Sequence, residues 1–173
     1  IFYLVFIILI SFPLLANNIA TIKISYIINN STEFSEFINK LDSIKNEIQK
    51  KLSSEENELV KTKLNIEESK ILLNELEFDK LVSEYNIEAK KFENKIISYE
   101  NYFNKNIETN KKIIIKFISD IVVEISNQNN YDLVINEDQY FLSSNKIDIS
   151  TKVLAKLNNL DLNLKIIEDS SLE

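Results

Sequence analysis

Residues 131–150 read YDLVINEDQYFLSSNKIDIS, and they decide the fold because sheet-forming sequence follows a long helical region. The nearly all-apolar segment 131–135 predicts a strand. A turn at 136–138 and a second strand at 140–142 are expected to follow. A hairpin of only two strands is marginally stable in water. The stretch therefore requires a partner strand elsewhere in the chain.

The partner strand is expected near the start of the chain. In residues 19–26 apolar and polar side chains alternate, which places Ile22 and Ile24 on one face of a half-buried strand. Asn30 followed by Glu33 predicts that a helix begins there with an Asn cap. The first strand is thus expected to run directly into a helix.

Between these ends, residues 31–127 contain neither Gly nor Pro, and their apolar residues recur at helical spacing. In the first half the apolar row is interrupted by Glu55, Thr62 and Ser69, which predicts a weak and bendable coiled coil. In the second half the steps alternate between four and three, which predicts a left-handed coiled-coil seam. The first row contains Ile38, Leu41, Ile48, Leu52, Leu59, Ile66, Leu73 and Leu76, and the second contains Phe78, Val82, Tyr85, Ala89, Phe92, Ile96, Tyr99 and Phe103.

A straight helix of this length would extend about 145 Å and would separate the strand at 19–26 from those at 131–142. A helical hairpin would bring both ends together, although no residue marks its tip. The fold is therefore predicted to be α+β, a long antiparallel coiled-coil hairpin on a small β-sheet body with a short C-terminal helix. The expected divisions are a first body strand at 17–30, arms at 31–127 with the tip near 66–80, body strands and a helix capped by Asp148 at 128–158, and a tail at 159–173 that is either an edge strand or an unstructured extension.

Residues 1–16, IFYLVFIILISFPLLA, are uncharged and predict part of a signal peptide. Pro13 interrupts the run, and Ala16 is a small residue suited to a cleavage point. Asn17 and Asn18 leave fewer than the roughly 20 apolar residues that a membrane-spanning helix needs. Export is the first interpretation, and a retained inner-membrane anchor is the alternative.

The composition excludes most catalytic chemistry. The chain has no His, Cys or Gly, so His acid–base catalysis, thiolate chemistry and glycine-rich phosphate loops lack their residues. Its acidic cluster at 132–138 belongs to a turn, where such residues are common. No enzyme activity, catalytic residue, metal or cofactor is expected. With 20 basic residues, all Lys, against 27 acidic ones, the chain is also poorly suited to nucleic acid.

The ends of the chain resemble the periplasmic chaperone family called Skp or OmpH. The resemblance covers about 19–158 and is most specific in YDLVI at 131–135, the aromatic Tyr140, and the DIS motif that begins at Asp148 and continues to Asn158. It implies an ATP-independent holdase that encloses unfolded outer-membrane proteins between helical arms. It further implies a homotrimer in a Gram-negative periplasm, whose body would include Ile22, Ile24, Leu133 and Ile135.

The net charge of −7 departs from the basic character of well-known members, so lipopolysaccharide binding is not carried over. Client capture would then rely on apolar contacts, for which Tyr102 and Phe117 are candidates, or on local Lys groups. The alternative for both aromatic residues is packing between the arms or against the body. Other functions left open are an envelope coiled-coil adaptor and a membrane-anchored stalk protein, the latter requiring an unbent rod.

Overall fold

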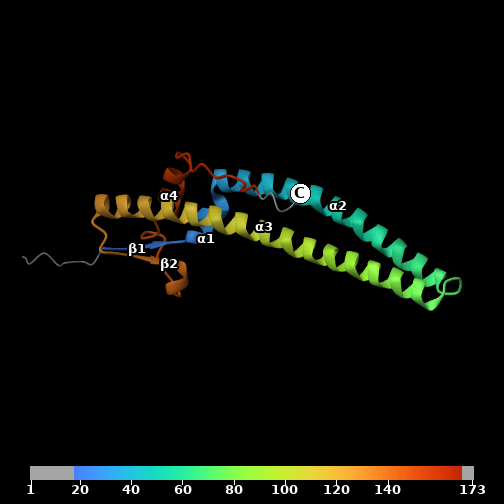
Figure 1. Ribbon diagram of the computed structural model, residues 1–173. Helices are drawn as coiled ribbons and strands as arrows, with labels where there is room; N and C mark the ends of the chain where they lie inside the picture. The colour runs from blue at the N-terminus through green and yellow to red at the C-terminus, as the bar shows by residue number, and fades with distance from the viewer. Residues whose placement is uncertain (1–17, 169–173) are drawn as a thin grey trace, which may run out of the picture.

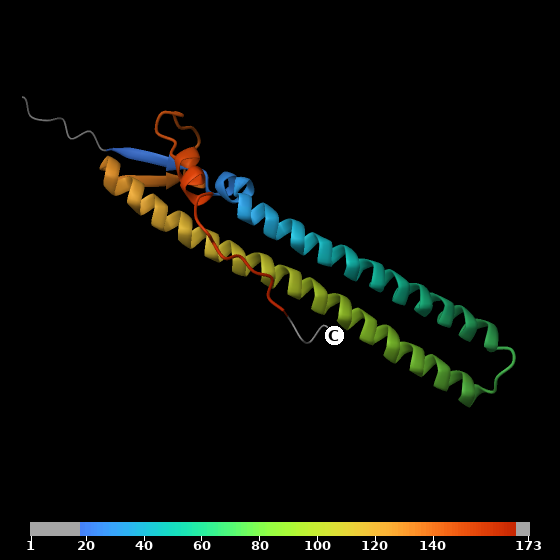
Figure 2. The same cartoon turned by 90° about the horizontal axis from the view of Figure 1, so that it is seen from above.

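The structure is a computed structural model that describes residues 18–168 of the 173-residue chain (Figure 1). The predicted leader at 1–16 lies outside the described residues. The described elements are β1 (Ile19–Ile22), α1 (Ile24–Asn30), α2 (Thr32–Ser69), α3 (Glu75–Asn129), β2 (Leu133–Asn136), the 3-10 helix η1 (Glu137–Gln139) and α4 (Ser150–Leu157). Helices α2 and α3 form a long antiparallel hairpin, and the remaining elements gather at the end opposite its tip (Figures 1 and 2). The predicted α+β architecture is confirmed.

The chain reverses direction in the short segment 70–74, between the two long helices. Asn74 caps α3 by a reciprocal capping box, in which its Oδ1 accepts from the Glu77 amide at 3.0 Å. Leu76, expected in the seam, is instead 82% exposed. That expectation was wrong because α2 ends at Ser69. Leu76 therefore lies in the first turn of α3, and it does not continue the apolar row of α2 that faces α3.

The apolar seam of the second arm is confirmed, since every residue from Phe78 to Phe103 on the predicted row is buried or half-buried. Towards the body the helices enclose a denser core, where Phe34 of α2 and Ile121 of α3 belong to one apolar cluster. Residues Ile114, Ile118, Ile121 and Ile125 are all at most 4% exposed. The doubled-back hairpin thus brings residues far apart in sequence into one core.

The body contains a sheet of two parallel strands, β1 and β2, in which Ile19 pairs with Leu133 and Ile22 with Asn136. On its other side β1 contacts 147–149, because Thr21 donates its amide to Ile147 O at 2.8 Å and accepts from the Ile149 amide at 2.9 Å. The predicted strand at 140–142 was wrong. The loop after η1 instead carries the chain across β1, which buries Ile149 at 2% exposure.

The first strand is shorter than predicted, because the chain leaves the sheet after Ile22. Side chains satisfy the next amides: Ser150 Oγ accepts from the Lys23 amide at 2.8 Å, and Asn136 Oδ1 accepts from the Ile24 amide at 3.2 Å. Helix α1 then buries Ile27, which is fully inaccessible. The predicted strand over 23–26 was therefore wrong.

The predicted Asn30 cap was also wrong, because Asn30 ends α1 and donates to Tyr26 O at 2.8 Å. The extended residue Ser31 separates α1 from α2. Asn158, which follows α4, accepts from the Thr32 amide at 3.0 Å. A distant side chain thus supplies the capping acceptor and joins α2 to the end of α4.

The described part of the predicted tail, 159–168, forms neither an edge strand on the sheet nor an extension free of the fold. Residues 161–168 have no regular secondary structure and run along the helical hairpin, with Asn163 in a left-handed conformation at φ 54° (Figure 2). Leu162 is 3% exposed within the core, and its amide donates to the Glu33 carboxylate at 3.0 Å. Both expectations for this segment were wrong, because its alternating Leu and Ile side chains cover the junction of the long helices.

Candidate functional site: the helical arms

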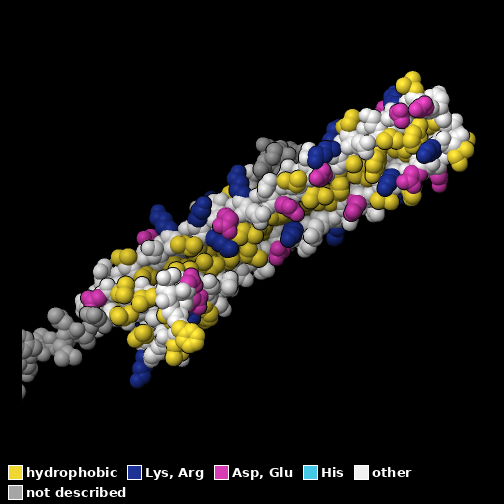
Figure 3. Space-filling model, turned by 90° about the horizontal axis from the view of Figure 1, so that it is seen from below, with side chains coloured by type: hydrophobic (Ala, Val, Ile, Leu, Met, Phe, Trp, Pro, Cys, Tyr) yellow, Lys and Arg dark blue, Asp and Glu magenta, His cyan; other side chains and the backbone are white. Residues whose placement is uncertain are grey.

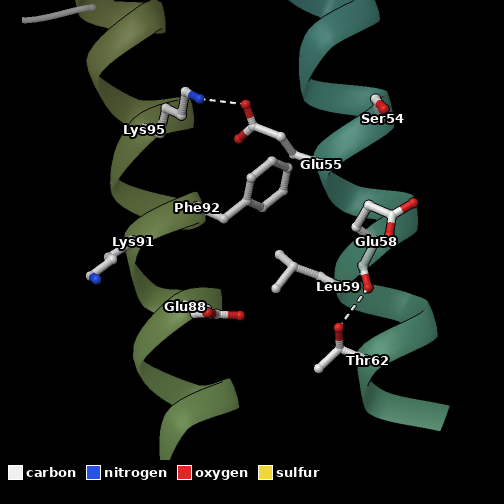
Figure 4. A pocket seen from close by; sticks show the side chains of 9 residues that line it. All are labelled: Ser54, Glu55, Glu58, Leu59, Thr62, Glu88, Lys91, Phe92 and Lys95. Atoms are coloured by element: carbon white, nitrogen blue, oxygen red, sulfur yellow. Dashed lines mark hydrogen bonds and ion pairs between the residues drawn. The ribbon is translucent and has the colours of Figure 1, made fainter. Parts of the chain in front are cut away.

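The arms, defined as the parts of α2 and α3 beyond Leu41 and before Asn106, do not fill the space between them. A hollow of about 480 Å³ lies midway along, where Phe92 and Leu59 point into the gap from opposite helices (Figure 4). Its other lining residues are mostly polar, and Lys95 forms an ion pair with Glu55 across the gap at 2.5 Å. The hollow thus lies where the α2 row carries the polar residues Glu55 and Thr62.

A second hollow of about 470 Å³ lies nearer the body and is lined by Ile48, Leu52, Tyr99 and Phe103 among others. Closely packed side chains hold two helices in one arrangement through many contacts, and each void removes some of those contacts. Two hollows along one seam predict that the arms bend and separate more easily than the core near Ile118.

Large apolar side chains are exposed along the arms and most strongly at the tip. Ile71, Leu72 and Leu76 are 91%, 86% and 82% exposed, and they form what is called here the tip cluster. Four more apolar residues of the arms are about half exposed: Val60, Leu64, Ile87 and Ile97. Figure 3 shows hydrophobic side chains in a band along the hairpin, flanked by Lys and by Asp and Glu side chains. Such surface is suited to contact with apolar segments of another chain.

The body is held by charged contacts around Asp148. Its carboxylate accepts from the Ser150 amide at 2.8 Å and pairs with Lys23 at 3.1 Å. Burial opposes ionisation of Asp148, but the Ser150 hydrogen bonds and the Lys23 charge outweigh it, so the pKa of this carboxyl lies below its ordinary value. The hydrogen bond from Lys23 to the Asp148 carboxylate and the negative charge of that carboxylate raise the pKa of Lys23. The contact links β1 to the start of α4.

The structure places the residues predicted for the oligomer body on the two strands and α1. Ile22 is 4% exposed and Ile24 is half-buried, whereas Leu133 is 50% exposed and Ile135 is half-buried. Leu133 and Ile135 lie on β2, which pairs with β1 along one edge. Within residues 18–168 the sheet has no further strand beyond β2.

The two candidate client-contact residues lie near the body. Tyr102 is 8% exposed and packs edge-to-face on Phe103 with ring centroids 5.3 Å apart. Phe117 is half-buried against the core. Client contact by either residue stays a prediction.

Sequence reasoning missed the tip cluster, since exposure there depends on where α2 ends. It also missed Asn106 and Asn110, two buried Asn residues on α3. A signal was present, because both lie in steps of four between the buried residues Tyr102 and Ile114.

Neither metal coordination nor membrane crossing is indicated by the described residues. In 18–168 no three Asp or Glu side chains gather into a metal-binding group. Over the same range, no helix has both the length and the apolar character to cross a bilayer.

Comparison with known proteins gives two findings. A family model described as outer membrane protein (OmpH-like) matches residues 18–157. A solved structure of a candidate outer membrane chaperone (OmpH-like) from Caulobacter crescentus CB15 superposes with a TM-score of 0.70 at 10% identity, over 82% of this chain and 84% of that one. No curated protein matches the sequence.

Proposed function

Because the chain belongs to the OmpH-like family of outer membrane chaperones, we propose that it acts as an ATP-independent periplasmic holdase for unfolded outer-membrane proteins. The observation that carries the proposal is the exposed apolar surface of a loosely packed hairpin, most pronounced in the tip cluster. A holdase needs apolar contact and adaptable geometry, and it needs no reaction chemistry.

The arms supply the adaptable geometry. Their two hollows allow the helices to shift against each other, so clients of different shape can meet the same apolar band. The core around Ile118 and Ile121 anchors the hairpin at one end. Motion is thereby confined to the part of the molecule that contacts the client.

A cavity requires more than one hairpin, and a homotrimer is therefore part of the proposal. The side of β2 facing away from β1 carries no strand within 18–168 and could pair with another copy. Half-exposed Leu133 supports such an assembly, since apolar residues on a free strand edge favour association. Several arms projecting from one body would enclose a space that separates one client from others.

Aggregation suppression tests the proposal. An outer-membrane barrel protein is diluted from urea with the purified chain, and light scattering is followed over time. Replacing the tip cluster by Ser (Ile71→Ser, Leu72→Ser, Leu76→Ser) should raise the concentration needed for half suppression by about threefold to tenfold, because apolar contact area is lost.

The matched control is Phe141→Ser with Leu142→Ser, which removes exposed apolar side chains from the body loop and leaves the arms unchanged. It should suppress aggregation as the parent chain does. An equal loss in both variants would contradict client capture by the arms, and absence of suppression by the parent chain would reject the holdase function.

A further inference from the structure

Segment 161–168 packs between the beginning of α2 and the part of α3 around Asn106 and Asn110, and the surface that it covers is called here the groove. Figures 1 and 2 both show it running along the hairpin. Its apolar side chains alternate: Leu162 is buried, Leu164 and Ile166 are half-buried against the core, and the intervening Asn163 and Lys165 are exposed. Asn163 has a left-handed backbone with φ 54°, so Leu162 lies apart from the strand-like portion. Residues 164–167 lie in the groove as an amphipathic strand would lie on a sheet.

Two buried Asn side chains of α3 hydrogen-bond to the backbone of this segment. Asn110 accepts from the Lys165 amide at 3.2 Å and donates to the Lys165 carbonyl at 3.0 Å. Asn106 accepts from the Ile167 amide at 2.7 Å and contacts the Ile167 carbonyl at 3.5 Å. Each side-chain amide thus makes the pair of bonds that a residue of a neighbouring strand would make.

The spacing of the two Asn residues matches that of a strand. Positions four apart on a helix rise about 6 Å, and residues two apart on a strand are separated by about 6.6 Å. Each Asn also donates to a helix carbonyl one turn back, Asn106 to Tyr102 O at 3.0 Å and Asn110 to Asn106 O at 2.9 Å. Those bonds orient the amides from within α3, so the array is fixed by the helix itself.

Asn106 and Asn110 hydrogen-bond only to backbone atoms of the bound segment, so these bonds do not depend on the identity of its side chains. Buried Asn is unfavourable within a helix unless its polar atoms are paired, and apolar residues would suffice merely to cover Leu164 and Ile166. The array therefore suits any extended segment whose apolar residues fall at every second position. Strands of β-barrels that face lipid on one side have that pattern.

We propose that this groove, with Asn106 and Asn110 as its backbone-binding residues, is a client site for extended segments with alternating apolar residues. Residues 161–168 are its resident occupant, which a client strand displaces. This inference rests on the proposed holdase function and assigns a strand-binding site to it. Because the occupant is tethered, it competes at high effective concentration and should weaken client binding to the resting chain.

The test releases the occupant in the full chain and leaves the groove unchanged. The double variant Lys165→Pro with Ile167→Pro removes the two backbone N–H groups that donate hydrogen bonds to Asn110 and Asn106. The matched control, Lys165→Ala with Ile167→Ala, keeps both N–H groups. The probe is a fluorescent synthetic peptide that alternates Leu or Val with Thr or Lys, and its anisotropy is measured. The Pro pair should lower the peptide dissociation constant at least about fivefold relative to the Ala pair.

Adding Asn106→Leu and Asn110→Leu to the Pro pair should abolish that gain. Equal peptide affinity in the Pro and Ala pairs, or a gain that survives the Leu substitutions, would overturn the proposal. Circular dichroism checks that the helices are intact. Should the Pro pair disturb them, Glu33→Gln weakens the Leu162 contact alone and should shift peptide affinity in the same direction.

Aggregation suppression measured on the same variants separates the two proposals. Suppression that is equal in all of them, with unchanged peptide affinity, rejects the groove and retains the holdase. Asn-dependent peptide binding without suppression of barrel aggregation retains the groove and rejects the holdase.

Discussion

At the scale of single residues, contacts between distant side chains and backbone close the body. Asp148 joins Lys23 to the start of α4, and Asn158 accepts from the first amide of α2. In both contacts a residue near the start of the described chain is bonded to a residue near its end. The sequence predicted that Asp148 caps the C-terminal helix, which was wrong because Ile149 holds the N-cap position of α4 without a side-chain cap bond. The ion pair of Asp148 with Lys23 depends on the parallel packing of 147–149 beside β1 and could not be inferred locally.

Asp148→Asn should destabilise the chain by about 1 kcal/mol at pH 7, since the ion pair is lost while an acceptor for Ser150 remains. The folded-state pKa of Asp148 is lowered, so the unfolded state takes up this proton first as pH falls. The stabilisation is present above the ordinary Asp pKa of about 4 and is lost as pH falls through the lower folded value. Urea unfolding at pH 7 and near pH 2 measures the difference.

In that experiment the parent chain and the variant should converge at the lower pH. Asp42→Asn, at an exposed position of α2, serves as the control and should change stability little at either pH. A difference between parent and Asp148→Asn that stays constant across pH would show that the carboxylate charge does not stabilise the fold.

At the scale of elements, the seam shows how far periodicity predicts structure. The row from Phe78 to Phe103 was predicted correctly because spacing along one helix is a local property. The strand at 140–142 was not, since strand pairing depends on where a loop carries the chain. The groove depends on the same kind of long-range contact, because the buried Asn106 accepts a hydrogen bond from the amide of Ile167, 61 residues further along the chain.

Filling the seam should stiffen the arms. Thr62 lines the hollow beside Phe92 and its hydroxyl donates within α2 to Glu58 O, so Thr62→Leu adds apolar contact without removing a bond between the helices. It should stabilise the hairpin by about 0.5–1 kcal/mol. Backbone amides near the hollow should exchange about twofold to fivefold more slowly, as measured by hydrogen–deuterium exchange.

Lys63→Leu is the matched control, because it adds a Leu side chain at the neighbouring exposed position. It should leave exchange near the hollow unchanged. Equal slowing in both variants would attribute the effect to general hydrophobicity and not to the under-filled seam.

At the scale of the whole molecule, one body holds a projecting hairpin, and the proposed trimer would repeat it around an enclosed space. Light scattering of the purified protein should give three times the mass of one chain. Leu133→Asp with Ile135→Asp should shift the mass to that of a single chain, because like charges would then line the edge of β2 proposed to pair.

Phe141→Asp is the control for assembly, since Phe141 is fully exposed on the loop after η1. Its mass should equal that of the parent. A parent mass of one chain would leave the hairpin without an enclosed space and would reject the trimer.

The parallel pairing of β1 with β2 has a consequence for the order of folding. A hydrogen bond joins Asn18 to Asp132 across 114 positions of sequence. Closing the body therefore costs the conformational entropy that is lost when a very long loop is closed. Near the turn at 70–74, the residues of α2 and α3 that face each other are close in sequence. The contacts between the two helices are therefore expected to form first at the tip of the hairpin and then to extend towards the body. A chain emerging vectorially, from a ribosome or a translocation pore, would therefore carry a formed hairpin with an open body until β2 and then 147–149 arrive to pack beside β1.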